Sequence, residues 1–303
     1  MPNSKQKLHI TEDWRPKTDI ASNLCLPTLI LQLLAPHSQH SLLASCFQIL
    51  DLLLTLPPAM TEEALSFTWQ PDFLPSVLSI ITLTVCFVVF WFLSESEKIH
   101  QQIGVNRSKE AASVAKVVYQ KMMGVFFLGI IPIVIALLFL PYSLAEYGLS
   151  FQNTGTSMLW ICGIAVIVFP LNIRAARRPD NLAYYPMMRA ESWDWRLVLL
   201  NAAATTAYLF SYELLFRGIL LTAGVVTLGV WPGIAINIAL YSTTHLPKGP
   251  AETIGAIPFG LLMCYITLTT GTIWVAVVAH IILSLSNDYL AVYYNPTMKF
   301  SRR

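Results

Sequence analysis

Seven long apolar runs divide this 303-residue chain, and they limit what it can fold into more than any other feature of the sequence. A helix needs roughly 20 mostly apolar residues to cross a bilayer. All seven runs are close to that length, whereas an eighth and weaker run contains Asp51 and ends at Pro57. The expected spans are 73–93, 124–142, 157–173, 197–222, 224–244, 254–270 and 272–293, with 41–57 as the weaker candidate.

The composition agrees with a membrane-embedded chain. Apolar residues make up 55% of it and charged residues only 12%, whereas about a quarter of a typical soluble protein is charged. So much apolar surface excludes intrinsic disorder. The net charge of +2, without a long basic run, argues against nucleic acid as a partner. The sequence therefore predicts an all-α polytopic bundle of seven or eight transmembrane helices, with the lipid bilayer as its surroundings.

Basic residues gather in alternate loops, which predicts the orientation of the chain. The segment 143–156, between two expected spans, carries Glu146 but no Lys or Arg. Because Lys and Arg accumulate on the cytoplasmic side, we expect 94–123, 174–196 and the C-terminus in the cytoplasm. The cations on that side are Lys98, Arg107, Lys109, Lys116, Lys121, Arg174, Arg177, Arg178, Arg189, Arg196, Lys299, Arg302 and Arg303.

Residues 1–60 differ in character from the rest and are expected to form an N-terminal extension. If 41–57 spans the membrane, the basic N-terminus is cytoplasmic; if it does not, the N-terminus lies outside. A third interpretation is that Met60 is the true start of the protein. No cleavable signal peptide is expected, because residue 1 is not followed by a short basic and then apolar opening.

A few ionisable residues interrupt the later runs. A charged side chain at the centre of a membrane helix costs roughly 2.5–3.5 kcal/mol, so such residues are candidates for function. Glu213 and Arg217 lie four positions apart, on one helix face. His245 ends the next run, and His280 lies in the last.

Each of these residues also has a purely structural interpretation. Glu213 and Arg217 could form an ion pair that only stabilises the fold, His245 could be an interfacial residue, and His280 could hydrogen-bond a neighbouring helix. Asn287 and Asp288, near the cytoplasmic end, are expected to be solvated. As a set, one carboxylate and two imidazoles suit water activation, or a zinc site with Glu213, His245 and His280 as ligands.

In order and in successive apolar runs, these residues resemble the CAAX prenyl protease 2 and bacteriocin-processing (CPBP, or ABI) family of intramembrane endopeptidases. The family's first motif, Glu-Glu-x-x-x-Arg, appears here as Tyr212-Glu213-Leu-Leu-Phe-Arg217. The second, an aromatic residue followed by histidine at the fourth position, runs from Tyr241 to His245. The third begins at His280. The resemblance covers about residues 180–290.

Two departures from the family pattern concern the chemistry. Tyr212 stands where the family has the glutamate taken as its base, and Ser284 stands where the third motif has asparagine. Glu252, seven residues after His245, is a candidate second carboxylate, and Asn287 is a candidate replacement for the missing amide. The resemblance implies Glu213, His245, His280 and Glu252 as catalytic residues, with Arg217, Tyr212, Ser284 and Asn287 in support.

The resemblance implies an intramembrane endopeptidase that acts on a membrane-associated peptide or protein. No cofactor is expected, with divalent zinc as the alternative. Other hypotheses are a catalytically weakened relative that acts as an immunity or scaffold protein, and a small proton-coupled transporter. Family habit favours a bacterial inner membrane. The division expected after the extension is 61–179 for the first helices and the cytoplasmic loop, 180–293 for the catalytic core, and 294–303 for a cytoplasmic tail.

Overall fold

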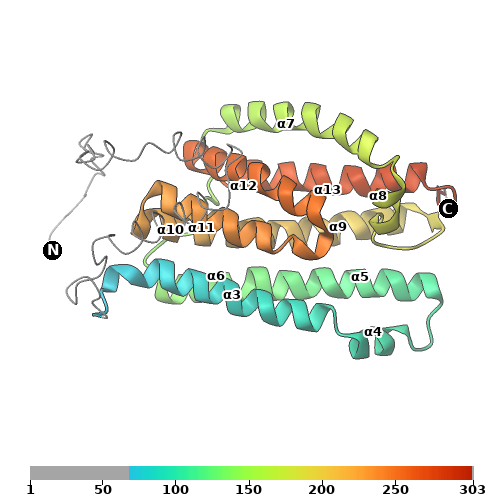
Figure 1. The fold of residues 1–303 in the computed structure, drawn as a ribbon, viewed down its shortest axis with the longest axis horizontal. Coiled ribbons are helices and arrows are strands. Elements are labelled where there is room, and N and C mark those ends of the chain that lie inside the picture. Colours follow the sequence, from blue (N-terminus) through green and yellow to red (C-terminus); the bar gives the residue numbers. More distant parts are fainter. Residues whose placement is uncertain (1–67, 302–303) are drawn as a thin grey trace, which may run out of the picture. The chain divides into compact units, whose positions relative to one another are not determined.

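The computed structural model describes residues 68–301, which form an all-α bundle with two very short strands (Figure 1). Six helical segments in this part of the chain are long and apolar enough to cross a membrane. The expected all-α polytopic fold is therefore confirmed. The six segments are Pro71–Ser94, Lys109–Phe139, Thr154–Ala175, Trp195–Leu228, Pro250–Thr270 and Trp274–Tyr294.

Several of these segments contain more than one helical element. The α-helices are α3 (Leu74–Ser94), α4 (Glu97–Gly104), α5 (Lys109–Val125), α6 (Ile131–Phe139), α7 (Thr154–Ala175), α8 (Pro179–Tyr184), α9 (Trp195–Glu213), α10 (Leu221–Leu228), α11 (Val230–Thr243), α12 (Pro250–Thr270) and α13 (Trp274–Tyr294). The π-helical turns are η3 (Phe126–Ile130) and η4 (Leu214–Leu220), and the 3₁₀ turns are η2 (Pro71–Phe73) and η5 (Leu246–Lys248). The strands are β1 (Ser192–Trp193) and β2 (Lys299–Phe300).

Helix α9 and its continuation lie at the centre of residues 68–301. In Figure 1, α3, α5 and α6 run along one side of α9, and α13 and α12 along the other, with α7 outermost. Contacts agree with this view, since α9 packs against α5 and α13, and α13 packs against α7. Helix α9 is therefore in a position to meet residues from both sides of the bundle.

The spans differ from the expected ones at two places. The expected run 124–142 belongs to a longer segment that begins at Lys109, so Lys121 lies inside a helix rather than in a loop. The expected run 224–244 is divided at Gly229, whose φ of 91° ends α10. Glycine adopts such a left-handed conformation without the steric penalty of a Cβ atom. The remaining part, α11, has 14 residues, and the run 41–57 lies outside the described residues.

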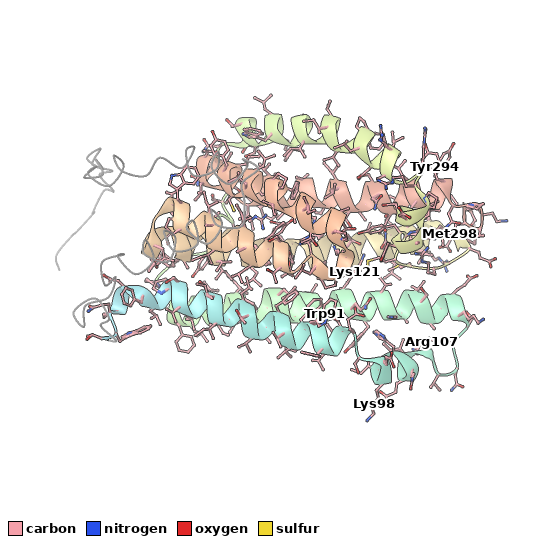
Figure 2. All side chains as sticks on the ribbon, in the orientation of Figure 1. Trp91, Lys98, Arg107, Lys121, Tyr294 and Met298 are labelled. Atoms are coloured by element: carbon pink, nitrogen blue, oxygen red, sulfur yellow. The ribbon has the colours of Figure 1, made fainter. Side chains whose placement is uncertain are left out.

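The basic connections and the end of the described chain lie together at one end of the bundle. Figure 2 labels Lys98 and Arg107 at the same end as Met298. The connection before α9 and the C-terminal residues also pair directly, as β1 and β2 form a parallel two-stranded sheet with Ser192 opposite Lys299. The charge asymmetry of the sequence thus coincides with a real division between the two ends.

An apolar cluster around α9 and η4 holds the polar residues described below in place. It joins residues of α3, η3, α11 and α12 to Tyr212 and Phe216, both of which are buried. Helix α9 begins where the Asp194 carboxylate accepts a hydrogen bond from the Leu197 N–H at 2.8 Å, which satisfies one of the free amides of the first turn. The members of the cluster are Leu83, Phe90, Leu128, Tyr212, Leu215, Phe216, Leu220, Tyr241 and Ala256.

Candidate active site

Glu213 and His280 form the central contact of the site. His280 Nδ1 lies 2.6 Å from Glu213 Oε1, although the residues are 67 positions apart in the chain. Glu213 is fully buried and His280 is 7% exposed. A carboxylate oxygen can only accept, so the imidazole donates its Nδ1–H, and Nε2 of the ring is left with a free lone pair. This is how a carboxylate fixes the tautomer and orientation of a histidine base.

Arg217 balances the buried charge of Glu213. Its Nε atom lies 3.5 Å from Glu213 Oε2, and both side chains are fully buried. The guanidinium carbon is also 4.1 Å from the centroid of the Tyr241 ring, a distance at which the face of an aromatic ring attracts a cation. Glu213 therefore has a hydrogen-bond partner at Oε1, which is His280, and an ionic partner without a hydrogen bond at Oε2, which is Arg217.

Arg217 lies within a π-helical turn, and a neighbouring helix supports this turn. Turns of this kind are rare and occur often at functional sites. The Asn237 side chain, from α11, donates to the Phe216 carbonyl oxygen at 2.6 Å. The Cys264 thiol, from α12, in turn donates to Asn237 Oδ1 at 3.3 Å. These contacts fix η4 beside the carboxylate. Asn237 was missed in the sequence, where its one signal is an amide within an apolar run.

His245 lies at the end of α11 with its ring fixed by the backbone. Its Nδ1–H donates to the Tyr241 carbonyl oxygen at 2.9 Å, which leaves Nε2 as an acceptor. Burial lowers the pKa of His245 to about 3, and the positive charge of Lys248 acts in the same direction. His245 is therefore neutral at pH 7 and can accept a hydrogen bond from water, but it is a weak base.

Tyr212 packs against both histidines. Its ring centroid is 5.8 Å from that of His280 and 6.2 Å from that of His245, with near-perpendicular planes in both cases. Its hydroxyl is 2.6 Å from Thr244 Oγ1, at the end of α11. The aromatic ring thus takes the place that the family motif gives to a glutamate side chain, and it brings no carboxylate to the site.

Glu252 is held at the start of α12, by other partners. Tyr185 donates its hydroxyl to Glu252 Oε1 at 2.7 Å, and Lys248 Nζ lies 3.7 Å from Oε2. The Glu252 side chain is 35% exposed. Burial and the neighbouring Glu252 raise the pKa of Tyr185, which keeps this hydroxyl protonated as the donor. In the described residues, the hydrogen-bond and ionic partners found for Glu252 do not include a histidine.

The two other supporting residues lie on α13 beyond His280. Ser284 is half-buried, one helical turn after His280. Asn287 accepts a hydrogen bond from the Asn181 side chain at 3.1 Å, which links α13 to α8. The amide of Asn287 is therefore used to hold the connection before α9.

A zinc site would need Glu213, His245 and His280 to converge on one point. Within residues 68–301, no group of three or more His, Cys, Asp or Glu side chains is arranged to hold a metal ion. As they are placed, Glu213, His245 and His280 are not such a group, and the zinc alternative stays a prediction. Each of the two imidazoles uses Nδ1 as a hydrogen-bond donor.

Two charged residues lie where the sequence did not predict them. Asp288 was expected to be solvated, but it is 2% exposed and accepts a hydrogen bond from Asn201. Lys121 was counted among the loop cations, but it is 6% exposed and donates to the same asparagine. The physical reason is that Asn201 on α9 supplies a hydrogen-bond partner to each of the two charges, and neither α5 nor α13 supplies one itself.

Comparison with protein families gives one match over this region. Residues 192–286 match the family described as type II CAAX prenyl endopeptidase, Rce1-like. The resemblance drawn from the motifs is confirmed for this segment. It covers about a third of the chain and includes α9 to α12 and most of α13. No curated protein and no solved structure matches the chain.

The family match and the fold together establish that the protein is embedded in a membrane. A segment similar to a family of membrane endopeptidases lies in a chain with six apolar helices that are long enough to span a bilayer. The chain is an integral, multi-pass membrane protein. The candidate catalytic residues Glu213, His245, Glu252 and His280 all fall within the matched segment.

Proposed function

We propose that this protein is an intramembrane endopeptidase in which Glu213 and His280 act together to activate water. The observation that carries the proposal is the 2.6 Å hydrogen bond between the two buried side chains. A carboxylate that accepts the Nδ1–H of a histidine stabilises the imidazolium that forms when Nε2 takes a proton. This pairing supplies a base even though Tyr212 replaces the first glutamate of the family motif.

The proposed reaction is hydrolysis of one peptide bond. His280 Nε2 takes a proton from water as the water oxygen attacks the carbonyl carbon of the substrate, which forms a tetrahedral intermediate. The same proton then passes to the amine nitrogen as the carbon–nitrogen bond breaks. His245 accepts a hydrogen bond from the water or the substrate through Nε2. Arg217 balances the negative charge of Glu213 throughout.

The proposed substrate is a membrane-associated peptide whose scissile bond enters the bundle from the basic end. Two features support this choice. The matched family is described as a CAAX prenyl endopeptidase, a name that specifies a prenylated CAAX sequence, and the candidate residues are buried among apolar side chains. We therefore choose a fluorogenic peptide with a farnesylated Cys-aliphatic-aliphatic-X end as the first probe, and the unprenylated peptide as its comparison.

The test compares carboxylate and histidine variants in purified protein in detergent. Glu213→Gln and His280→Gln are expected to lower turnover by about 10²-fold or more, the scale of a lost general base. Glu252→Gln is the matched control, because it makes the same carboxylate-to-amide change at a carboxylate bound to Tyr185 and Lys248. It is expected to leave turnover within about three-fold of the unmodified protein.

Three results would contradict the proposal. Full activity of folded Glu213→Gln would remove the carboxylate from the mechanism. Loss of activity in Glu252→Gln alone would move the base to the start of α12. If folded, unmodified protein cleaved neither the prenylated nor the unprenylated peptide, the protease would give way to the binding-protein hypothesis.

A further inference from the structure

A second group of buried polar residues lies outside the family motifs. It consists of Lys121 on α5, Asn201 and Thr205 on α9, and Asp288 on α13, and we call it the buried polar network. All four residues are at most 6% exposed. Figure 2 labels Lys121 on the side of α5 that faces the rest of the bundle. Charged residues at such positions in a membrane protein are costly, and they mark function more often than chance.

Asn201 joins the two charges of the network. Lys121 Nζ donates to Asn201 Oδ1 at 3.2 Å and also to Thr205 Oγ1. Asn201 Nδ2 donates to Asp288 Oδ2 at 3.1 Å. One amide therefore accepts from the cation and donates to the anion. If Asn201 is lost, both buried charges lose a hydrogen-bond partner, which destabilises a protein strongly.

The network and the active site connect the same two helices. Helix α9 carries Asn201 and, twelve positions later, Glu213, while α13 carries His280 and, eight positions later, Asp288. The two helices run in opposite directions and pack against each other. The contacts Asn201–Asp288 and Glu213–His280 lie at different positions along the two helix axes. Together they restrain both the translation of one helix along the other and its rotation about its own axis. The contact at Asn201 thus restrains the contact at Glu213.

We propose that Lys121, Asn201 and Asp288 are positioning residues that hold α13 in the register at which His280 meets Glu213. Lys121 adds the third helix, α5, and so stops Asn201 from turning away from Asp288. The kinetic part of this proposal rests on the proposed endopeptidase activity, whereas the geometric part does not. A displacement of about 1 Å between reacting groups can cost 10²-fold in rate, so a small change of register is enough.

The first experiment compares two buried asparagines that both bind α13. Asn201→Ala cuts the link from α9. Asn172→Ala is the matched control, because Asn172 on α7 donates to the Leu283 carbonyl oxygen at 2.8 Å and to Ser286 Oγ at 2.7 Å. We expect Asn201→Ala to lower kcat by about 10-fold or more with KM within about two-fold. For Asn172→Ala, both constants should stay within about two-fold, per amount of folded protein.

A double variant that removes both charges separates the loss of positioning from poor folding of the single variants. Lys121→Met and Asp288→Asn each leave one buried charge without its opposite, and each should lower kcat. The double variant carries no charge at either position, and the amide introduced by Asp288→Asn can still accept a hydrogen bond from Asn201. Because no charge then lacks its opposite, we expect its kcat to exceed that of both single variants, while the lost hydrogen bond from Lys121 to Asn201 keeps it below that of the unmodified protein. A double variant that is worse than both single variants would overturn the proposal.

A second readout does not depend on activity. In protein labelled with ¹⁵N-histidine, the proton on His280 Nδ1 should give a far-downfield resonance, because its hydrogen bond to a carboxylate is short. Its disappearance in His280→Gln assigns the signal. Asn201→Ala should shift it upfield or abolish it, and Asn172→Ala should leave it unchanged.

The outcomes separate the two proposals. If the protein cleaves no peptide but the His280 resonance responds to Asn201→Ala as expected, the endopeptidase proposal fails and the positioning role stands. If the protein is active, and folded Asn201→Ala keeps both its kcat and the resonance, the positioning role fails alone. Equal losses in Asn201→Ala and Asn172→Ala would also overturn it, because they would indicate general loosening of α13.

Discussion

At the scale of single residues, Tyr212 is the position at which this chain departs most from the family motif. Its hydroxyl lies 2.6 Å from Thr244 Oγ1, and its ring packs edge-on against both histidines. We infer that the ring, rather than the hydroxyl, is what the site requires. Tyr212 then acts by packing and by excluding water from Glu213.

Tyr212→Phe tests this role directly. It removes the hydroxyl and keeps the ring, so kcat is expected to stay within about three-fold, while the loss of one hydrogen bond lowers the free energy of unfolding by about 1 kcal/mol. Peptide turnover and denaturant unfolding in detergent measure the two effects. A loss of turnover of 10²-fold would instead give the hydroxyl a part in the reaction.

His245 gives the site a predictable dependence on pH. Burial lowers its pKa to about 3, against about 6.5 in the unfolded chain. Between these values the unfolded state binds more protons than the folded one, so stability is fully present above pH 6.5 and falls as the pH drops toward 3. By pH 5 the loss should reach about 2 kcal/mol.

The measurement compares His245→Gln with the unmodified protein. Unfolding free energies at pH 7.5 and pH 5 should differ by about 2 kcal/mol less in the variant, because the titrating ring is gone. An equal pH dependence in both proteins would mean that His245 is not buried as described.

At the scale of elements, the close approach of α10 and α11 places the second motif. A Cβ atom on Gly233 would lie 2.8 Å from the Val225 backbone nitrogen and 2.9 Å from the Gly224 carbonyl carbon. Small residues allow membrane helices to approach this closely. Because α11 ends just before His245, its distance from α10 also sets where the imidazole lies.

Gly233→Ala should therefore separate the two helices. We expect a loss of about 1–3 kcal/mol in stability, as for other overpacked cores, and a lower turnover. Gly163→Ala, on α7, is the matched control, because nothing lies within 4 Å of a Cβ atom there. It should be neutral, or stabilising by up to about 1 kcal/mol from helix propensity. Similar unfolding midpoints for the two variants would refute the close approach.

At the scale of the whole molecule, the basic connections and the C-terminal residues of the bundle share one end. This arrangement agrees with the orientation expected from the positive-inside rule, in which that end is cytoplasmic. A reporter enzyme that is active only in the cytoplasm, fused after Arg303, should be active. A reporter that is active only outside should be silent at the same position, and the reverse pattern would invert the proposed topology.

Much of the fold could be predicted from the sequence because the rules that govern it are local. The length of an apolar run decides whether a helix can span the bilayer, and the expected spans 73–93, 157–173, 254–270 and 272–293 lie within described candidate segments or within two residues of their ends. The break at Gly229 was missed, since a single glycine in an apolar run does not reveal its φ. The start of the second segment at Lys109 was missed for a different reason, because α5 carries polar residues, and its lysine Lys121 is buried through a partner on α9 that the local sequence does not reveal.

The candidate residues were also found from the sequence, but their arrangement was not. An ionisable side chain in an apolar run is costly wherever it meets lipid, so Glu213, Arg217 and His280 were recognisable as exceptions without any structure. Which of them touch, and through which atoms, depends on how α9, α11 and α13 cross. Only the tertiary structure pairs His280 with Glu213, places Glu252 with Tyr185, and buries Lys121 and Asp288 around Asn201. The physical reason is that the free-energy cost of burying a charge depends on the residue itself and can be read from the sequence. The hydrogen bonds and ion pairs that offset this cost come from partners far away in the chain, which only the tertiary structure brings close.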